Sequence, residues 1–258
     1  MEITRTRRPA ARAYAWLWKL VLAAGTVALG ACSLPRVDSG LPSGPTAPVA
    51  RPASAKLPPS QAEVETILNQ METAYDEVTN YQVAVEVIFF SKRGATKSQT
   101  CLYSFMKPNR IRLDFLSPNP GMIMVYPDAD GKVILKPVGL LSPFTFHLAL
   151  DDPLLQTPSG QQLNQTDLGT LIRNIRHSVT DQRRGPISIS TDKDSVRIEV
   201  LADDHFRKGV ATKYQFVIGK ARWLPLEVDA ATTKGVPVEK IVFRNFRENI
   251  DVPDGFFQ

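Results

Sequence analysis

Cys32 is the residue of this chain whose type and position could most clearly do chemistry. A cysteine sulfur is a strong nucleophile, and here it directly follows the small or apolar residues 29–31. Upstream lie a basic head over 5–12 and an uncharged, mostly apolar run over 20–31. This arrangement is typical of a cleavable export signal. The run is shorter than the roughly 20 residues that a membrane-spanning helix needs, which disfavours a permanent transmembrane anchor.

The order Leu29-Gly30-Ala31-Cys32 resembles the bacterial lipobox, where the leader is removed and the cysteine is acylated, for example with palmitate. The resemblance implies a signal peptide over 1–31 and a mature chain that begins at Cys32 and is held to a membrane by lipid. The alternative is an ordinary secretory signal, with Cys32 an incidental thiol. Ser33 occupies the position where aspartate favours inner-membrane retention, so we expect the periplasm-facing side of the bacterial outer membrane.

The other reactive side chains predict neither catalysis nor metal binding. His147, His177 and His205 are far apart in the sequence and lack the spacing of metal ligands. The sequence has no Gly-x-Ser-x-Gly motif, phosphate-binding loop or dinucleotide fingerprint. Cys101 lies in a segment of alternating apolar residues, which favours a buried, inert thiol. We therefore expect no enzymatic activity, no metal and no cofactor.

Net charge excludes one class of partner. The whole chain has a formal charge of +5, but five basic residues and one acidic residue fall within 1–31, so the mature chain carries only +1. A near-neutral protein offers no basic surface for a nucleic-acid backbone, and we expect no nucleic-acid partner. If Cys32 is acylated, Cys101 has no partner for an internal disulfide, and the fold must depend on its hydrophobic core.

The composition divides the mature chain into two parts. Residues 32–59 contain seven prolines among serine, alanine and glycine, with almost no bulky apolar residue. Such a segment cannot bury enough apolar surface to offset its ordering entropy, so we predict a disordered tether. Residues 60–258 are long enough for one sizeable domain with a hydrophobic core.

Two amphipathic helices are predicted within this domain. Ser60 and Glu63 have the spacing of a capping box, and apolar residues over 64–78 recur at helical intervals. A second helical period occupies 167–177. The apolar run over 140–150 has no clear period and is interpreted as a loop.

Most of the remaining domain alternates with period two between short turns. This pattern predicts about ten strands, over 81–89, 100–107, 110–117, 121–126, 132–138, 187–190, 196–201, 212–218, 224–230 and 238–246. Short connections favour antiparallel neighbours. We expect an α+β fold with one large curved antiparallel sheet, a half-barrel, in preference to a two-sheet sandwich.

One apolar face of the first four strands is the candidate binding surface. An apolar concave face can hold a hydrophobic ligand, although the same alternation also describes a filled core. The candidate ligand-lining residues are Val85, Val87, Phe89, Tyr103, Phe105, Ile111, Leu113, Phe115, Met122 and Met124.

Several segments, in order, resemble the LolA-type lipoprotein carriers. The segments are 107–115 (KPNRIRLDF), 131–137 (GKVILKP), 223–226 (WLPL), 241–245 (IVFRN) and 249–257, which ends in two phenylalanines. The resemblance covers about two thirds of residues 60–258. Residues 140–159 match no motif of the family, and the membrane-inserting loop of the LolB branch has no recognisable counterpart in the sequence.

The resemblance implies a half-barrel whose concave face is covered by helices and holds acyl chains. The lipid anchor favours a LolB-like acceptor of an acyl chain or lipoprotein, active in lipoprotein or lipid localisation. An RseB-like module, which senses a ligand or binds an envelope protein partner without transport, is the alternative. A hydrolase within 140–159 is a third hypothesis.

Overall fold

The structure is a computed structural model that describes residues 61–91, 96–155, 157 and 160–258. The predicted signal peptide, Cys32, the tether and Ser60 lie outside the described residues. Helix α2 (Gln61–Asp76) leads into the meander β1 (Asn80–Phe90), β2 (Thr96–Met106), β3 (Arg110–Ser117), β4 (Ile123–Tyr126) and β5 (Val133–Lys136). Strand β6 (Phe146–Leu148) follows. The second half contains α3 (Leu168–Val179), β7 (Ser188–Thr191), β8 (Ser195–Asp203), β9 (Ala211–Gly219), β10 (Leu224–Thr232) and β11 (Pro237–Glu248).

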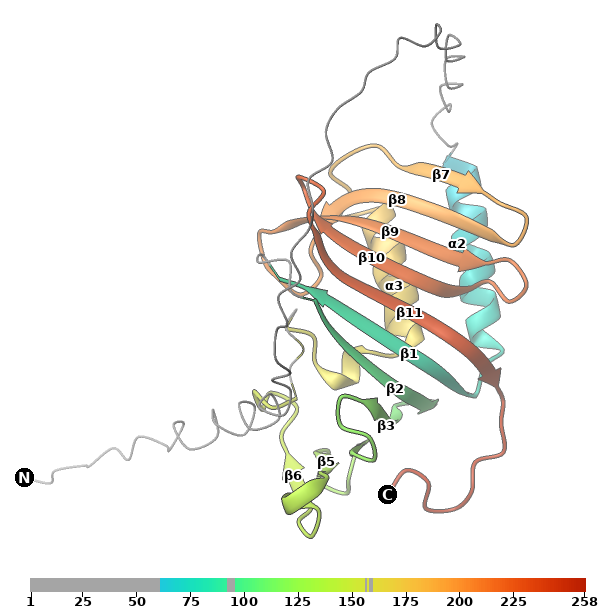
Figure 1. Ribbon diagram of the computed structural model, residues 1–258. Helices are drawn as coiled ribbons and strands as arrows, with labels where there is room; N and C mark the ends of the chain where they lie inside the picture. The colour runs from blue at the N-terminus through green and yellow to red at the C-terminus, as the bar shows by residue number, and fades with distance from the viewer. Residues whose placement is uncertain (1–60, 92–95, 156, 158–159) are drawn as a thin grey trace, which may run out of the picture. The chain divides into compact units, whose positions relative to one another are not determined.

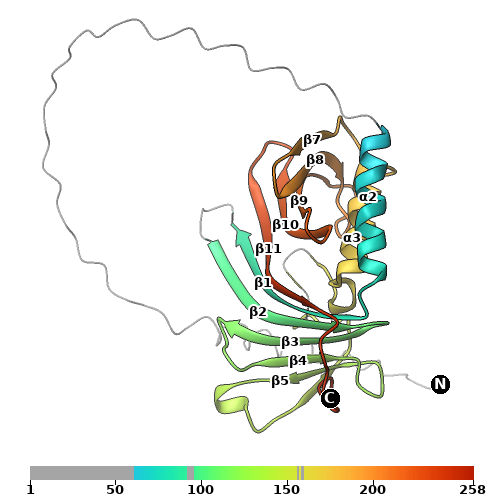
Figure 2. The ribbon, with the colours of Figure 1, turned by 90° about the vertical axis from the view of Figure 1, so that its right-hand side faces the viewer.

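All described strands form one open antiparallel sheet. The sheet has eleven strands in the order β6-β5-β4-β3-β2-β1-β11-β10-β9-β8-β7, so the two edge strands are β6 and β7. The first and last strands of the domain, β1 and β11, pair in the middle and join the two meanders. Figure 2 shows that the sheet is strongly curved and that α2 and α3 both lie on its concave side. The predicted α+β half-barrel is confirmed.

Local boundaries differ from the predictions at a few places. Strand β6 (Phe146–Leu148) pairs with β5 where a loop was predicted, because residues 140–150 were too irregular to show period two. Met122 precedes β4 and does not belong to it. Helix α2 ends at Asp76, two residues before Val78, which is buried in the turn that follows. Two short 3-10 turns, at Gly139–Leu141 and Leu163–Gln165, occupy the β5–α3 connection.

Two groups of buried side chains hold the helices against the sheet. The α2 stripe of Val64, Ile67, Leu68 and Met71 packs on β8, β9 and β10 in one group. The second group joins β1, β2 and β3 to Leu168 at the start of α3 and to the preceding connection. Burial of these side chains excludes water from the part of the concave face beneath the helices. We call α2 and α3 together the lid.

Gly169 lets the two lid helices approach closely. A Cβ at this position would lie 2.6 Å from a ring carbon of Tyr75, closer than such atoms approach in proteins. The Tyr75 hydroxyl donates to the Asp167 carboxylate at 3.4 Å, and Asp167 caps α3 by accepting from the Thr170 amide at 3.0 Å. The cap satisfies an amide that helix geometry leaves without a partner.

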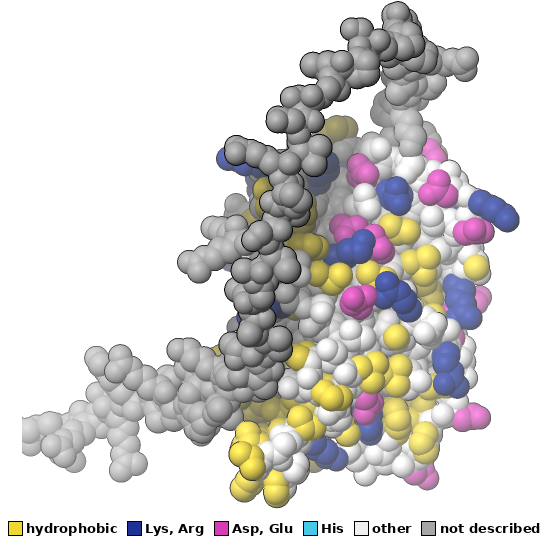
Figure 3. Space-filling view, in the orientation of Figure 1, with side chains coloured by type: hydrophobic (Ala, Val, Ile, Leu, Met, Phe, Trp, Pro, Cys, Tyr) yellow, Lys and Arg dark blue, Asp and Glu magenta, His cyan; other side chains and the backbone are white. Residues whose placement is uncertain are grey.

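The opposite, convex face carries the end of the chain. Figure 1 looks onto this face, and Figure 3 shows it with hydrophobic side chains more numerous in its lower half, over β1 to β5. Residues 249–258, which we call the C-terminal segment, follow β11 and reach β3 and β5 on this side. Among the described residues no helix is long and apolar enough to cross a membrane.

Candidate hydrophobic binding face

Strand register places the predicted ligand-lining residues on one face of the sheet. Residues directly opposite each other in an antiparallel pair point to the same side. Tyr103 pairs with Leu113, Phe105 with Ile111, and Leu113 with Met124. Phe115 lies opposite Cys101, which in turn faces Val85 on β1, and Val87 and Phe89 continue the same alternation. Met122 packs against the same side chains from the turn before β4.

Burial divides these ten residues into two parts. Val85, Tyr103, Phe105, Ile111, Leu113 and Phe115 are buried in the group beneath α3. Val87, Met122 and Met124 are only partly buried at its margin, and Phe89 is also partly exposed. The inner part is therefore a packed core, and only the marginal part is available to a ligand without movement of the lid. Contact with a ligand stays a prediction for all ten.

The structure adds residues to this margin that local patterns did not identify. Val87 lies opposite Ile241 and Val85 opposite Phe243, both on β11. Leu148 on β6 and Leu150 just after it pack against the same group. The alternation of β11 was visible in the sequence, but its pairing with β1 was not. We call the partly buried apolar residues of this margin the apolar strip: Val87, Met122, Met124, Leu148, Leu150, Ile241 and Phe243.

Two tyrosines anchor the base of the concave face and stay neutral. The Leu168 amide at the start of α3 donates to the Tyr81 hydroxyl at 3.0 Å, and the Tyr103 hydroxyl lies 3.0 Å from Thr166 Oγ1. Burial raises the pKa of both phenols above the ordinary value. Burial likewise raises the pKa of Cys101 to about 12, so this thiol is protonated at neutral pH, as predicted for an inert, buried cysteine.

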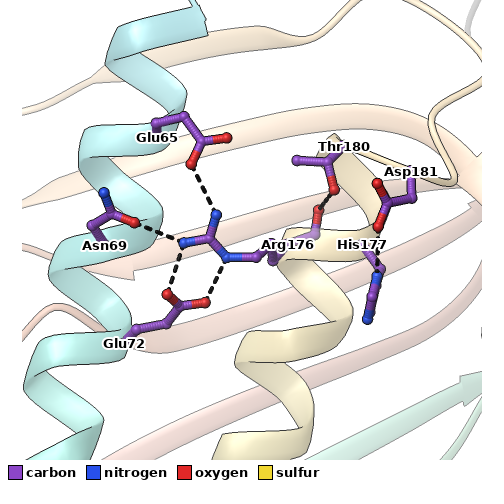
Figure 4. Close-up of polar contacts among 7 residues, drawn as sticks. All are labelled: Glu65, Asn69, Glu72, Arg176, His177, Thr180 and Asp181. Carbon is purple, nitrogen blue, oxygen red and sulfur yellow. Dashed lines mark hydrogen bonds and ion pairs between the residues drawn. The ribbon is translucent and has the colours of Figure 1, made fainter.

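Arg176 ties the two lid helices together, as Figure 4 shows. From α3 it reaches Glu72 on α2 through two bonds, of 2.5 and 2.7 Å, and Glu65 and Asn69 through one bond each, both 2.8 Å. The hydrogen bonds to Glu72 contribute most to raising the pKa of Arg176. Bidentate arginine–carboxylate pairs are among the stronger polar contacts in proteins. The lid is therefore one two-helix unit.

Ser178 and His205 form a pair that resembles part of a catalytic triad. Ser178 Oγ lies 2.8 Å from His205 Nε2, but Ser178 is fully buried. Burial pushes the pKa of Asp204 up, yet bonds from Arg207 and Thr212 outweigh it and keep that pKa below its ordinary value. Ser178 is inaccessible, and the Asp204 carboxylate accepts hydrogen bonds from Arg207 and Thr212. We therefore interpret the pair as a structural contact that holds α3 to the β8–β9 connection. Within the described residues no group of three His, Cys, Asp or Glu is placed to hold a metal.

Protonation of His205 is expected to weaken the domain. Burial lowers the pKa of His205 below its ordinary 6.5; the negative charge of Asp204 opposes this shift, and His177 adds to it. As the pH is lowered through about 6.5, the unfolded chain therefore binds a proton before the folded protein does. The free energy of unfolding decreases as the pH is lowered, until the pH is below the pKa of His205 in the folded protein. His205→Gln should flatten this dependence between about pH 5 and 7 in urea denaturation. His177→Gln removes only a smaller cause of the shift, since the burial of His205 remains, and should preserve most of the slope. An unchanged slope in His205→Gln would contradict the assignment.

The chain matches no family model and no curated protein sequence. Solved structures with a similar fold include an uncharacterized conserved protein from Thermus thermophilus, with 12% identity, a TM-score of 0.43, and 76% of this chain and 92% of that chain covered. MucB matches with 14% identity and a TM-score of 0.45 over 77% of this chain and 63% of its own. A LolA superfamily protein from Nitrosomonas europaea matches with 11% identity and a TM-score of 0.35 over 75% and 96%. These similarities concern the fold alone.

Proposed function

We propose that this chain is a lipid-anchored protein of the bacterial outer membrane, facing the periplasm, that holds an acyl chain or other hydrophobic cargo on its concave face. The observation that supports this most is the apolar strip. It continues the packed core outward as seven partly buried apolar side chains, which come from several strands and from residues directly beside them. A strip of this kind can bind a hydrophobic ligand, because removing its apolar surface from water is favourable and stabilises the complex.

The proposed role is lipoprotein or lipid localisation, in keeping with the LolA-like motifs. The connection between β5 and β6, residues 137–145, supports a role at the membrane surface, because Leu140 is 98% exposed and Phe144 is 57% exposed. Such apolar side chains can enter the interfacial layer of a bilayer. No catalytic step is part of this proposal.

Cargo binding is tested by a substitution on the apolar strip. Val87→Glu places a carboxylate on the partly buried apolar face, and the cost of burying that charge should abolish acyl-chain binding. Native mass spectrometry of protein purified from membranes should show bound lipid on the original chain and none on the variant. Ile88→Glu is the matched control, because Ile88 is the next residue of β1 and faces the convex side opposite Lys240. Equal lipid occupancy in both variants, or none in the original chain, would refute the proposed site.

Lipid anchoring is tested at Cys32. Cys32→Ala removes the sulfur that the lipobox resemblance identifies as the acylated atom, so the protein should remain an uncut or soluble precursor. Fractionation of cells and the intact mass of the product measure this directly. Recovery of the variant in the membrane fraction at the mature mass would exclude the lipobox interpretation.

Depletion of the protein from cells separates transport from sensing: trapped lipoproteins indicate transport, and altered stress signalling indicates an RseB-like role.

A further inference from the structure

The connection between α2 and β1 is where lid movement must be accommodated. Helix α2 ends at Asp76 and β1 begins at Asn80, so only residues 77–79 separate the lid from the centre of the sheet. An opening motion of α2 requires dihedral changes in a few residues at its end, as in other hinged elements. The last carbonyls of a helix also need partners outside the helix. The contacts of this turn therefore decide how freely the lid moves.

Asn249, the first residue of the C-terminal segment, hydrogen-bonds to three residues in and beside this turn. Its Oδ1 accepts from both the backbone amide and the hydroxyl of Thr79, each at 2.8 Å, and its Nδ2 donates to the Glu77 carbonyl at 3.3 Å. Its backbone amide donates to the Asn80 carbonyl at 2.8 Å. Asn249 adopts a left-handed conformation with φ of 49°, which asparagine tolerates better than most residues. One side chain thus fixes three groups of the hinge.

Lys107 completes the hold from the other side. Its Nζ donates to the Tyr75 carbonyl at 2.9 Å and to the Asp76 carbonyl at 3.3 Å, and lies 4.3 Å from the centre of the Tyr75 ring. Lys107 is fixed to the β2–β3 turn, so its contacts tie the end of α2 to the sheet. Asn249, in contrast, belongs to a segment that leaves the hinge and runs to the other face.

Beyond Asn249 the C-terminal segment is held to the convex face at separate points. Arg112 donates to the Phe256 carbonyl at 2.9 Å and stacks on the Phe256 ring at 4.6 Å, and Phe257 is buried. Between these points the segment borders two hollows, of about 480 and 770 Å³. The smaller hollow is lined by Gln82 and Arg247 from the sheet and by Asn249 itself. The residue that holds the lid hinge is therefore also part of the convex surface.

We propose that Asn249 is a latch that limits opening of the lid, and that the C-terminal segment thereby controls access to the concave face from the opposite side of the sheet. The role of the lid in cargo access rests on the proposed function. The latch itself is a property of the hinge and can be measured without any cargo. The latch depends on the side chain of Asn249, because any residue with the same φ at this position would keep the backbone hydrogen bond to Asn80.

The test removes this side chain without straining the backbone. Asn249→Gly retains the left-handed conformation, since glycine adopts positive φ at no steric cost, but loses the bonds to Thr79 and Glu77. Asn245→Gly is the matched control: Asn245 also has positive φ, 57°, and makes no side-chain hydrogen bond within the described residues. Hydrogen–deuterium exchange should become roughly fivefold faster or more in the last turn of α2 and in residues 77–80 of Asn249→Gly only. Exchange in β8 and β9 should stay unchanged in both variants.

Two results would overturn the latch. One is exchange in α2 that is the same in Asn249→Gly and Asn245→Gly. The other is acceleration shared equally by α2, β8 and β9, which would make Asn249 a contributor to global stability only. Thr79→Val removes just the hydroxyl that binds Asn249 Oδ1, and it should give a smaller acceleration at the same amides if Asn249→Gly does not fold. Because these readouts need no ligand, failure of the latch and failure of cargo binding are distinguishable.

Discussion

Replacing Tyr81 with alanine should lower the free energy of unfolding by about 3–5 kcal/mol, the range for truncating a large buried aromatic side chain. Tyr81 is 1% exposed, and its ring centre lies 5.3 Å from those of Phe105 and Phe246 and 5.9 Å from that of Tyr103. The substitution would remove the middle of this stack and leave a cavity between β1, β2 and β11. It would also leave the Leu168 amide without the hydroxyl that now accepts from it.

Tyr81→Phe separates packing from hydrogen bonding. It keeps the ring and removes only the hydroxyl, so the expected loss is about 1–3 kcal/mol, the cost of a buried amide left without a partner. Urea denaturation of both variants, with the slope against urea checked for constancy, measures the difference. A loss below about 1 kcal/mol for Tyr81→Ala would show that the aromatic stack does not hold the lid and the sheet together.

The strand pattern of this fold was largely predictable, because it is local. Alternation over 110–117 predicted β3 with its observed bounds, and the other predicted strands differ from the structure by a few residues at their ends. The short β6 was missed, since three residues among irregular apolar neighbours carry no period. The capping residue Asp167 was included in the second predicted helix, and the structure places it one residue before α3.

Pairing between distant segments could not be predicted from these patterns. Nothing in the alternation of 80–90 or 237–248 specifies that β1 and β11 lie side by side, because period two fixes which face a residue occupies and leaves its partner strand open. The same limit applies to the candidate site. Alternation placed Val85, Tyr103 and Leu113 on the apolar faces of their own strands, and only the strand register shows that these faces coincide. Alternation also could not separate the packed inner residues from the apolar strip. That division depends on where α3 and the β6–α3 connection cover the sheet.

Arg176→Ala should lower the free energy of unfolding by about 1–3 kcal/mol, the scale of hydrogen bonds to charged groups. The guanidinium makes four bonds to three side chains of α2, and its removal would leave Glu65 and Glu72 facing each other without a cation between them. The side chain is 27% exposed, so water will screen part of that repulsion and keep the loss below the value for a fully buried pair.

The matched control for Arg176 is Arg173, an exposed arginine one turn earlier on the same helix. Within the part of the chain that the structure describes, its side chain bonds only to Thr170 Oγ1, so Arg173→Ala should change stability by less than about 0.5 kcal/mol. Added salt should reduce the difference in the free energy of unfolding between the original chain and Arg176→Ala. Ions screen both the attraction in the original chain and the repulsion between the glutamates in the variant. Thermal and urea denaturation at two salt concentrations measure both effects. Equal losses for the two arginines would mean that apolar packing alone, through Leu68 and Met71 in particular, holds the lid as one unit.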